Sequence, residues 1–183
     1  MNTSPQLDPQ LQQACLLVGR FMYHFARVEQ RIDRAVIKLL KLDEKCAPIV
    51  GLLDFARKVD DLVRANAVKQ TTKRKDKDFV NEVCSRAHSV NGYRRIIAHA
   101  SFEPASGGGV LFSRPVTEKG SVRPVTEAWT EDNFATLCTQ MTTLEADLDK
   151  LIELVEPPDV PSFGWYTPWG DPVMSGRTPI TLL

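Results

Sequence analysis

The fold of this chain is decided around the segment Asn91-Gly92-Tyr93-Arg94-Arg95-Ile96-Ile97-Ala98-His99-Ala100. The segment ends a long helical pattern, and the residues that follow it have the glycines and the alternation of turns and strands. It also places an arginine five residues before a histidine. An arginine can hold a phosphate, and a histidine can transfer a proton near neutral pH. The pair therefore predicts a phosphodiester-cleaving site that uses no metal.

Three helices are predicted up to this point. The first covers roughly residues 8–41, where apolar residues recur at steps of three and four. The second contains the apolar positions of residues 52–63 and begins with Asp54 as its N-cap. The third follows the charged stretch 69–78 and ends near Ala100.

Residues 101–129 have a different character. After the glycines of 107–109, two strands are predicted at 110–112 and 122–129, around a turn at Glu118-Lys119-Gly120. The pentapeptide Arg-Pro-Val-Thr-Glu occurs on both sides of this turn, and its prolines confine the hairpin to an edge or an exposed ribbon. The predicted fold class is therefore mainly all-α, a bundle of four main helices with a β-hairpin inserted between the third and the fourth.

The last helix begins after Thr130, which is predicted to cap it. Its apolar residues form a seven-residue repeat, which is typical of either a core face or a dimer face. The repeat consists of Phe134, Leu137, Met141, Leu144, Leu148, Leu151 and Val155. We expect a helical domain at 1–156, followed by a tail at 157–183 that is rich in proline and aromatic residues. The aromatic residues favour a docked tail over a disordered one.

Composition limits the class of protein. The 183 residues suit one domain with an appendage, and no run of about 18 or more apolar residues could span a membrane. The polar N-terminus does not have the pattern of a signal peptide. The four cysteines lie far apart, which indicates free thiols in a reducing cytosol. These features predict a cytoplasmic protein.

Charge is unevenly distributed although the net charge is zero. Residues 57–100 contain 11 basic and 5 acidic side chains, whereas residues 101–183 contain 5 basic and 12 acidic ones. A positive field around Arg94 and His99 would attract a polyanion such as RNA. Lys73, Arg74 and Lys75 are predicted to hold the RNA backbone; alternatively, residues 69–77 form only a solvated loop.

The two residues of the motif do not share one face of an ideal helix. Five residues separate Arg94 from His99 by roughly 140°. They can converge through a frayed helix end, through a long arginine side chain, or through a second subunit, and the last option predicts a homodimer. A structural alternative is an interior ion pair between Arg94 and Glu29, because both occupy apolar-stripe positions.

No metal site or cofactor is predicted. The chain has three histidines, and they are scattered without an Asp, Glu or His at ligand spacing. His24 lies between apolar residues of the first helix and is interpreted as a packed or interface histidine.

Several features together resemble a HEPN domain. These are the long first helix with Glu29, the segment Leu-Leu-Asp-Phe-Ala-Arg-Lys-Val-Asp at 52–60, the Arg-x4-His at the end of the third helix followed by a hairpin, and Trp-Thr-Glu-Asp at 129–132. The resemblance covers roughly residues 8–155. It implies a helical bundle, commonly a homodimer, whose members in many cases cut RNA without a metal.

The resemblance also implies roles for individual residues. Arg94 and His99 would be the catalytic residues of the endoribonuclease. Glu29, Asn91 and Arg95 are predicted as supporting residues, and Arg95 is a departure, because members of the family often have Asn, Asp or His directly after the arginine. A toxin- or defence-like protein of this kind would have an antitoxin-like protein as a partner. Other members of the family are not catalytic. The alternatives are therefore a noncatalytic dimeric helical interaction module and a nucleotide-binding module.

Overall fold

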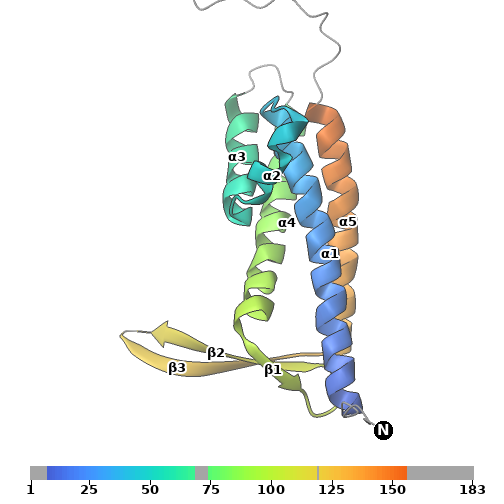
Figure 1. Ribbon diagram of the computed structural model, residues 1–183, viewed down its shortest axis with the longest axis vertical. Coiled ribbons are helices and arrows are strands. Elements are labelled where there is room, and N and C mark those ends of the chain that lie inside the picture. Colours follow the sequence, from blue (N-terminus) through green and yellow to red (C-terminus); the bar gives the residue numbers. More distant parts are fainter. Residues whose placement is uncertain (1–7, 69–73, 119, 156–183) are drawn as a thin grey trace, which may run out of the picture.

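The computed structural model describes residues 8–68, 74–118 and 120–155. These residues form a helical bundle with a small antiparallel sheet at one end (Figure 1). The helices are α1 (Pro9–Leu39), α2 (Ala47–Gly51), α3 (Phe55–Val68), α4 (Arg74–His99) and α5 (Glu131–Val155), with the 3-10 turn η1 at Glu44–Cys46, and the strands are β1 (Ser101–Pro104), β2 (Val110–Glu118) and β3 (Ser121–Trp129). The prediction of a mainly helical protein with strands before the last helix is confirmed.

Side chains cap the starts of the helices where the sequence predicts it. Asp54 Oδ1 accepts hydrogen bonds from the backbone N–H groups of Ala56 at 2.9 Å and Arg57 at 3.3 Å. Thr130 Oγ1 accepts from the Asn133 N–H at 3.2 Å. Each cap satisfies backbone donors that a helix start leaves without partners, so it fixes the residue at which α3 or α5 begins.

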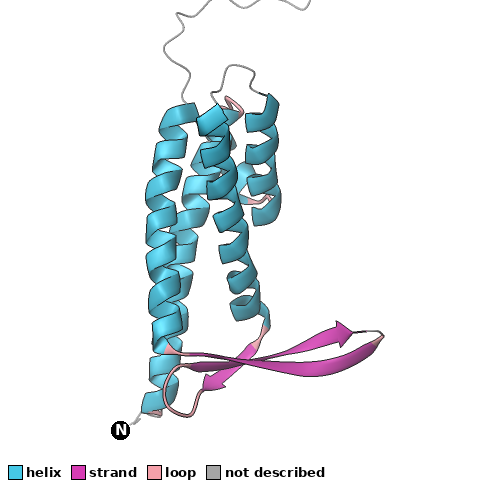
Figure 2. Cartoon of the chain, turned by 180° about the vertical axis from the view of Figure 1, so that it is seen from behind, coloured by secondary structure: helices cyan, strands magenta, loops and turns pink. Residues whose placement is uncertain are grey.

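The core lies mainly between α1 and α5, which run side by side along the bundle (Figures 1 and 2). From α1 it takes Phe21, Phe25, Val28 and Ile32, and from α5 it takes Phe134, Leu137, Met141, Leu144, Leu148 and Leu151, all of which are buried. The seven-residue repeat of α5 is therefore a core face of the single chain over these six residues; the side chain of Val155 lies outside the described residues.

One acidic residue interrupts the apolar packing of α5. Glu145 is 5% exposed. Its Oε2 lies 2.8 Å from Arg27 Nε and 3.1 Å from Arg31 Nη1, both on α1. A carboxylate removed from water in this way needs charged partners, and the two arginines supply them. The α1–α5 contact thus has a polar clamp beside its apolar seam.

The sheet has the strand order β1-β2-β3, and both pairs are antiparallel. The sequence did not predict β1, which pairs with the first four residues of β2. The turn between β1 and β2 contains Gly109, whose φ is 92°. A Cβ atom on Gly109 would lie 2.2 Å from the carbonyl oxygen of Trp129. The glycine is needed here both for its backbone conformation and for the close approach of β3.

The outer half of the β2–β3 hairpin forms a two-stranded ribbon. Pro115 is paired with Pro124, beyond the part of β2 that β1 covers, and both prolines are exposed. Proline has no N–H to donate, so the outer half suits a ribbon without a further strand. Figure 2 shows this ribbon extending well beyond the helices. The predicted exposed ribbon is confirmed.

Trp129 joins the sheet to the bundle. Its ring centroid lies 4.9 Å from that of Phe112, 5.5 Å from that of Phe134 and 5.6 Å from that of Tyr93. Edge-to-face contacts of this kind contribute about 0.5–1.5 kcal/mol each beyond the burial of their area. Because Tyr93 belongs to α4 and Phe134 to α5, the cluster fixes the sheet against the end of α4.

All four cysteines are free thiols, as predicted from their spacing. Cys84 and Cys138 are buried, Cys46 is half-buried and Cys15 is exposed. Across the described ranges, none of the helices has both the length and the apolarity that crossing a bilayer requires.

Candidate functional site

A pocket of about 240 Å³ lies where the last turns of α4 face α1 and the start of α3. Its lining consists of Asn91, Arg94, Arg95 and His99 from α4, Phe25 and Glu29 from α1, and Leu53, Asp54 and Phe55 at the start of α3. All five residues that the sequence singles out as catalytic or supporting are therefore in one place.

The arrangement of α3 leaves room for this pocket. In Figure 1, α3 covers only the part of α4 that is farther from the sheet. The four α4 residues of the pocket occupy a continuous arc of roughly 140° on the helix. Arg94 and His99 are at the ends of this arc, and Asn91 and Arg95 lie between them. A single chain therefore brings Arg94 and His99 to one pocket. Of the three routes expected from the sequence, neither the frayed helix end nor the second subunit is needed for this.

Arg94 is half-buried, and aromatic rings support it. Its Cζ atom lies 5.8 Å from the centroid of the Phe25 ring. Phe25 in turn packs on Phe55, with 5.0 Å between the ring centroids. An arginine held over an aromatic face keeps its donors available to a ligand while its position is restricted.

The predicted ion pair between Glu29 and Arg94 is not formed. Oε1 of Glu29 accepts a hydrogen bond from Nζ of Lys58 at 3.2 Å instead. Lys58 is fully buried, and its Nζ also lies 2.6 Å from Oδ1 of Asp33. The second carboxylate explains this choice of partner, because a buried ammonium with two acids is better compensated than one with a single acid.

The two acids of the pocket lining, Glu29 and Asp54, do not pair with its arginines. Glu29 pairs with Lys58, and Asp54 uses Oδ1 to cap α3. Among the residues that the structure describes, neither Arg94 nor Arg95 has an ion pair. The guanidinium groups can therefore bind an anion without first losing a carboxylate partner.

His99 is the last residue of α4 and is exposed to solvent. Within the described ranges its imidazole has no hydrogen bond or ion pair. Both ring nitrogens are thus accessible to a ligand in the pocket. A histidine in this situation can accept or donate a proton at a bound substrate.

The predicted backbone-binding residues lie at the other end of α4. Arg74 and Lys75 are exposed in its first turn, and Lys73 lies outside the described residues. At 1.5 Å per residue, Lys75 is roughly 30 Å along the helix from Arg94. These side chains are therefore not part of the pocket, and could contact only a distant portion of a long substrate.

Sequence reasoning missed several residues that shape the pocket. Lys58 carries Glu29, and Phe25 and Phe55 form the apolar wall behind Arg94. A signal for Lys58 was present. It lies within the apolar stripe of its helix, and Glu29 and Asp33 are four residues apart on α1, where two acids point to the same side.

The other two histidines have protein partners. His24 Nδ1 lies 3.6 Å from Glu145 Oε1, and the His24 ring packs edge-on against Tyr23. His88 Nε2 lies 3.1 Å from Asp60 Oδ1. The interpretation of His24 as a packed histidine is confirmed. No group of three or more His, Cys, Asp or Glu side chains gathers at metal-binding geometry in the described part of the chain.

Comparison with known proteins gave no relative. No family model matches the chain, and neither curated proteins nor solved structures gave a match.

Proposed function

We propose that this protein is a metal-independent endoribonuclease of the HEPN type, with Arg94 and His99 as its catalytic residues. The observation that carries the proposal is that both side chains line one pocket whose guanidinium groups have no carboxylate partner among the described residues. A pocket that combines a proton-transfer group with free phosphate ligands suits cleavage of a phosphodiester.

The proposed reaction uses the RNA itself as the nucleophile. The 2′-oxygen forms a bond to the adjacent phosphorus, and the bond from phosphorus to the 5′-oxygen of the next nucleotide breaks. His99 takes the proton of the 2′-hydroxyl or donates one to the leaving oxygen, and solvent exchanges the other proton. Such proton transfer contributes about 10²- to 10⁴-fold to the rate. The products are a 2′,3′-cyclic phosphate and a 5′-hydroxyl.

The arginines stabilise the charge of the transition state. Arg94, fixed over Phe25, donates to the phosphoryl oxygens as negative charge develops on them. Arg95 is exposed next to it and binds the neighbouring phosphate. The exposed Arg74 and Lys75 contact the strand farther along α4.

The order of the elements supports the HEPN assignment. A long α1 with Glu29, an α3 that begins at Phe55, and an α4 that ends at His99 before a hairpin follow the arrangement that the resemblance implies. The homodimer, the toxin- or defence-like role and the antitoxin-like partner that the resemblance implies are part of this proposal.

The decisive test is cleavage of single-stranded RNA in EDTA by purified protein. We expect wild-type protein to cut and His99→Ala to lose at least about 100-fold in rate. His88→Ala is the matched control, because His88 is on the same helix but pairs with Asp60 outside the pocket. Equal rates for His99→Ala and wild type would overturn the proposal.

The second candidate is a noncatalytic helical module that binds a second copy of the chain. Two large apolar side chains on α1 favour it. Leu16 is 61% exposed and Tyr23 is 59% exposed, and they are seven residues apart, which places them on the same side of the helix. RNA that stays intact with wild-type protein, together with a stable dimer, would support this function instead.

A further inference from the structure

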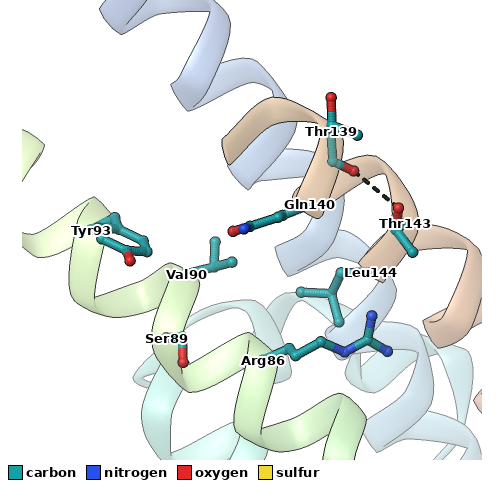
Figure 3. A pocket seen from close by; sticks show the side chains of 8 residues that line it. All are labelled: Arg86, Ser89, Val90, Tyr93, Thr139, Gln140, Thr143 and Leu144. Atoms are coloured by element: carbon teal, nitrogen blue, oxygen red, sulfur yellow. Dashed lines mark hydrogen bonds between the residues drawn. The ribbon is translucent and has the colours of Figure 1, made fainter. Parts of the chain in front are cut away.

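A second pocket, of about 440 Å³, lies in the groove between α4 and α5 (Figure 3). It shares no lining residue with the pocket of Arg94 and His99. Its size is within the range of small-ligand sites, which combine apolar walls with a few converging polar groups. The chemistry of its lining can therefore be used to deduce a ligand.

Two aliphatic side chains and one aromatic ring form the apolar part of the groove lining. Val90 from α4 and Leu144 from α5 belong to the lining, and Tyr93 lies at one end (Figure 3). Both aliphatic residues are buried, whereas Tyr93 is 37% exposed. A slot of this kind accepts a flat, largely apolar ring that can pack on the tyrosine.

Three hydroxyl groups in the lining have lone pairs that can accept hydrogen bonds from a ligand. Ser89 Oγ donates its hydrogen to the Ser85 carbonyl at 3.1 Å, Thr139 Oγ1 donates to the Ala135 carbonyl at 3.0 Å, and Thr143 Oγ1 donates to the Thr139 carbonyl at 3.1 Å. A hydroxyl has one hydrogen, so the lone pairs remain for a donor. A ligand that carries N–H or O–H groups can therefore use them.

Gln140 adds a group that both donates and accepts. Its side chain extends from α5 toward Val90 and Tyr93 of α4 (Figure 3). In the part of the chain that the structure describes, its amide has no hydrogen-bond partner. A carboxamide pairs in two-point fashion with the amino group and N7 of adenine.

The charge of the groove is compensated. Arg86 Nη2 lies 2.7 Å from Asp147 Oδ2, and Arg86 Nε lies 3.8 Å from Glu82 Oε1. Hydrogen bonds from Lys150 and Arg86 lower the pKa of the Asp147 carboxyl, which keeps this partner ionised. A phosphate would gain little here, because Arg86 already has its counter-charge.

We propose that this groove binds an adenine base. Tyr93 stacks on the ring, Gln140 pairs with the amino group and N7, and the hydroxyl of Thr143 accepts the second amino hydrogen. The phosphate of a nucleotide stays in solvent. The base comes either from a free adenosine nucleoside or nucleotide, or from an adenine of an RNA strand. This site goes beyond the proposed cleavage reaction, and its test does not depend on activity.

Adenosine and inosine form the matched ligand pair, because inosine has a carbonyl oxygen where adenosine has the amino group. We expect saturable binding of adenosine to the full chain by calorimetry and binding of inosine that is at least about tenfold weaker. In a second arm, the His99→Ala protein is titrated with short oligo(A) and oligo(U) RNA, so that cleavage cannot remove the ligand. If oligo(A) binds but adenosine does not, the base comes from an RNA strand. If adenosine itself binds, the base comes from a free ligand.

Two neighbouring threonines of α5 provide a matched pair of variants for the binding experiment. Thr143→Val removes the accepting hydroxyl and keeps the shape, and we expect it to weaken adenine binding about tenfold. Thr142→Val removes a hydroxyl that donates to the Cys138 carbonyl in the same way but lies outside the groove, so it should bind like wild type. The proposal is overturned if neither adenosine nor oligo(A) binds, or if Thr143→Val binds as tightly as wild type. Neither result would count against the proposed RNA cleavage, which takes place in the other pocket.

Discussion

Nζ of the fully buried Lys58 lies 2.6 Å from Oδ1 of Asp33. This contact connects α3 to α1 beside the candidate RNA-cleaving pocket, because the same Nζ also donates a hydrogen bond to Glu29 of the pocket lining. The position of Glu29 in the pocket thus depends on Lys58, and Arg94 is left free for a substrate.

The pairing of Glu29 with Lys58 in place of Arg94 can be measured as a coupling energy. We expect a double-mutant cycle of Glu29→Gln and Lys58→Met to give a coupling of about 1 kcal/mol or more in the free energy of unfolding, because these two residues share a contact. The matched cycle of Glu29→Gln and Arg94→Met should give less than about 0.5 kcal/mol. A larger coupling with Arg94 than with Lys58 would mean that the ion pair is assigned to the wrong residue.

The turn before β2 provides a test of the sheet. Gly109→Ala should destabilise the protein by roughly 3 kcal/mol or more, since it adds a steric clash with the Trp129 carbonyl to the strain of a positive φ. Gly107→Ala is the control. Gly107 has a similar φ of 93° but an open environment, so we expect a cost of about 1–2 kcal/mol. Chemical denaturation of both variants measures the difference, and equal costs would argue against the close approach.

Stability should decrease at alkaline pH because of a core thiol. Burial raises the pKa of Cys84 to about 11, from 9.0. The neutral thiol is the form that the core favours, so this contribution is fully present below pH 9 and is lost as the pH rises through 11. The loss can reach roughly 2–3 kcal/mol. We expect unfolding free energies between pH 8 and 11 to fall less steeply for Cys84→Ala than for wild type, with the exposed Cys15→Ala behaving like wild type.

The assembly state tests the implied homodimer. Analytical ultracentrifugation at micromolar concentration should give about twice the chain mass of 20.5 kDa. If the α1 surface is the interface, a charge at Leu16, as in Leu16→Glu, should dissociate the dimer without unfolding the chain, because this side chain is 61% exposed. A monomer for the wild-type protein would rule out the homodimer but not the one-chain pocket.

The four long helices were largely predictable from the sequence because each has a periodic apolar signal, whereas the five-residue α2 was not predicted and has no side-chain cap. Phe134 to Leu151 repeat over the core, and Asp54 and Thr130 fix helix starts. The short strand β1 was missed because four residues, Ser101–Pro104, show too little alternation. The strand β1 depends on its pairing with β2. The need for a glycine at position 109 depends on the close approach of the β3 backbone, which only the folded structure shows.

The sequence singles out five of the residues that line the candidate pocket, but it does not predict how they are arranged. Arg94 and His99 are recognisable by type and spacing, yet helix angles alone place them on different faces. They meet in one pocket because α3 begins only at Phe55 and leaves a broad arc of α4 uncovered. The partner of Glu29 was mistaken for a related reason. The choice between Lys58 and Arg94 depends on Asp33, whose proximity is a result of tertiary packing.

The most direct test of RNA cleavage by this pocket uses one short RNA and its analogue with a single 2′-deoxy nucleotide at the cut position. In EDTA, we expect wild-type protein to cut the RNA into fragments that end in a 2′,3′-cyclic phosphate, and to leave the bond after the 2′-deoxy nucleotide intact. His99→Ala should cut neither substrate at a measurable rate. Uncut RNA with folded wild-type protein, or cleavage that does not require the 2′-hydroxyl or His99, would contradict the proposed function.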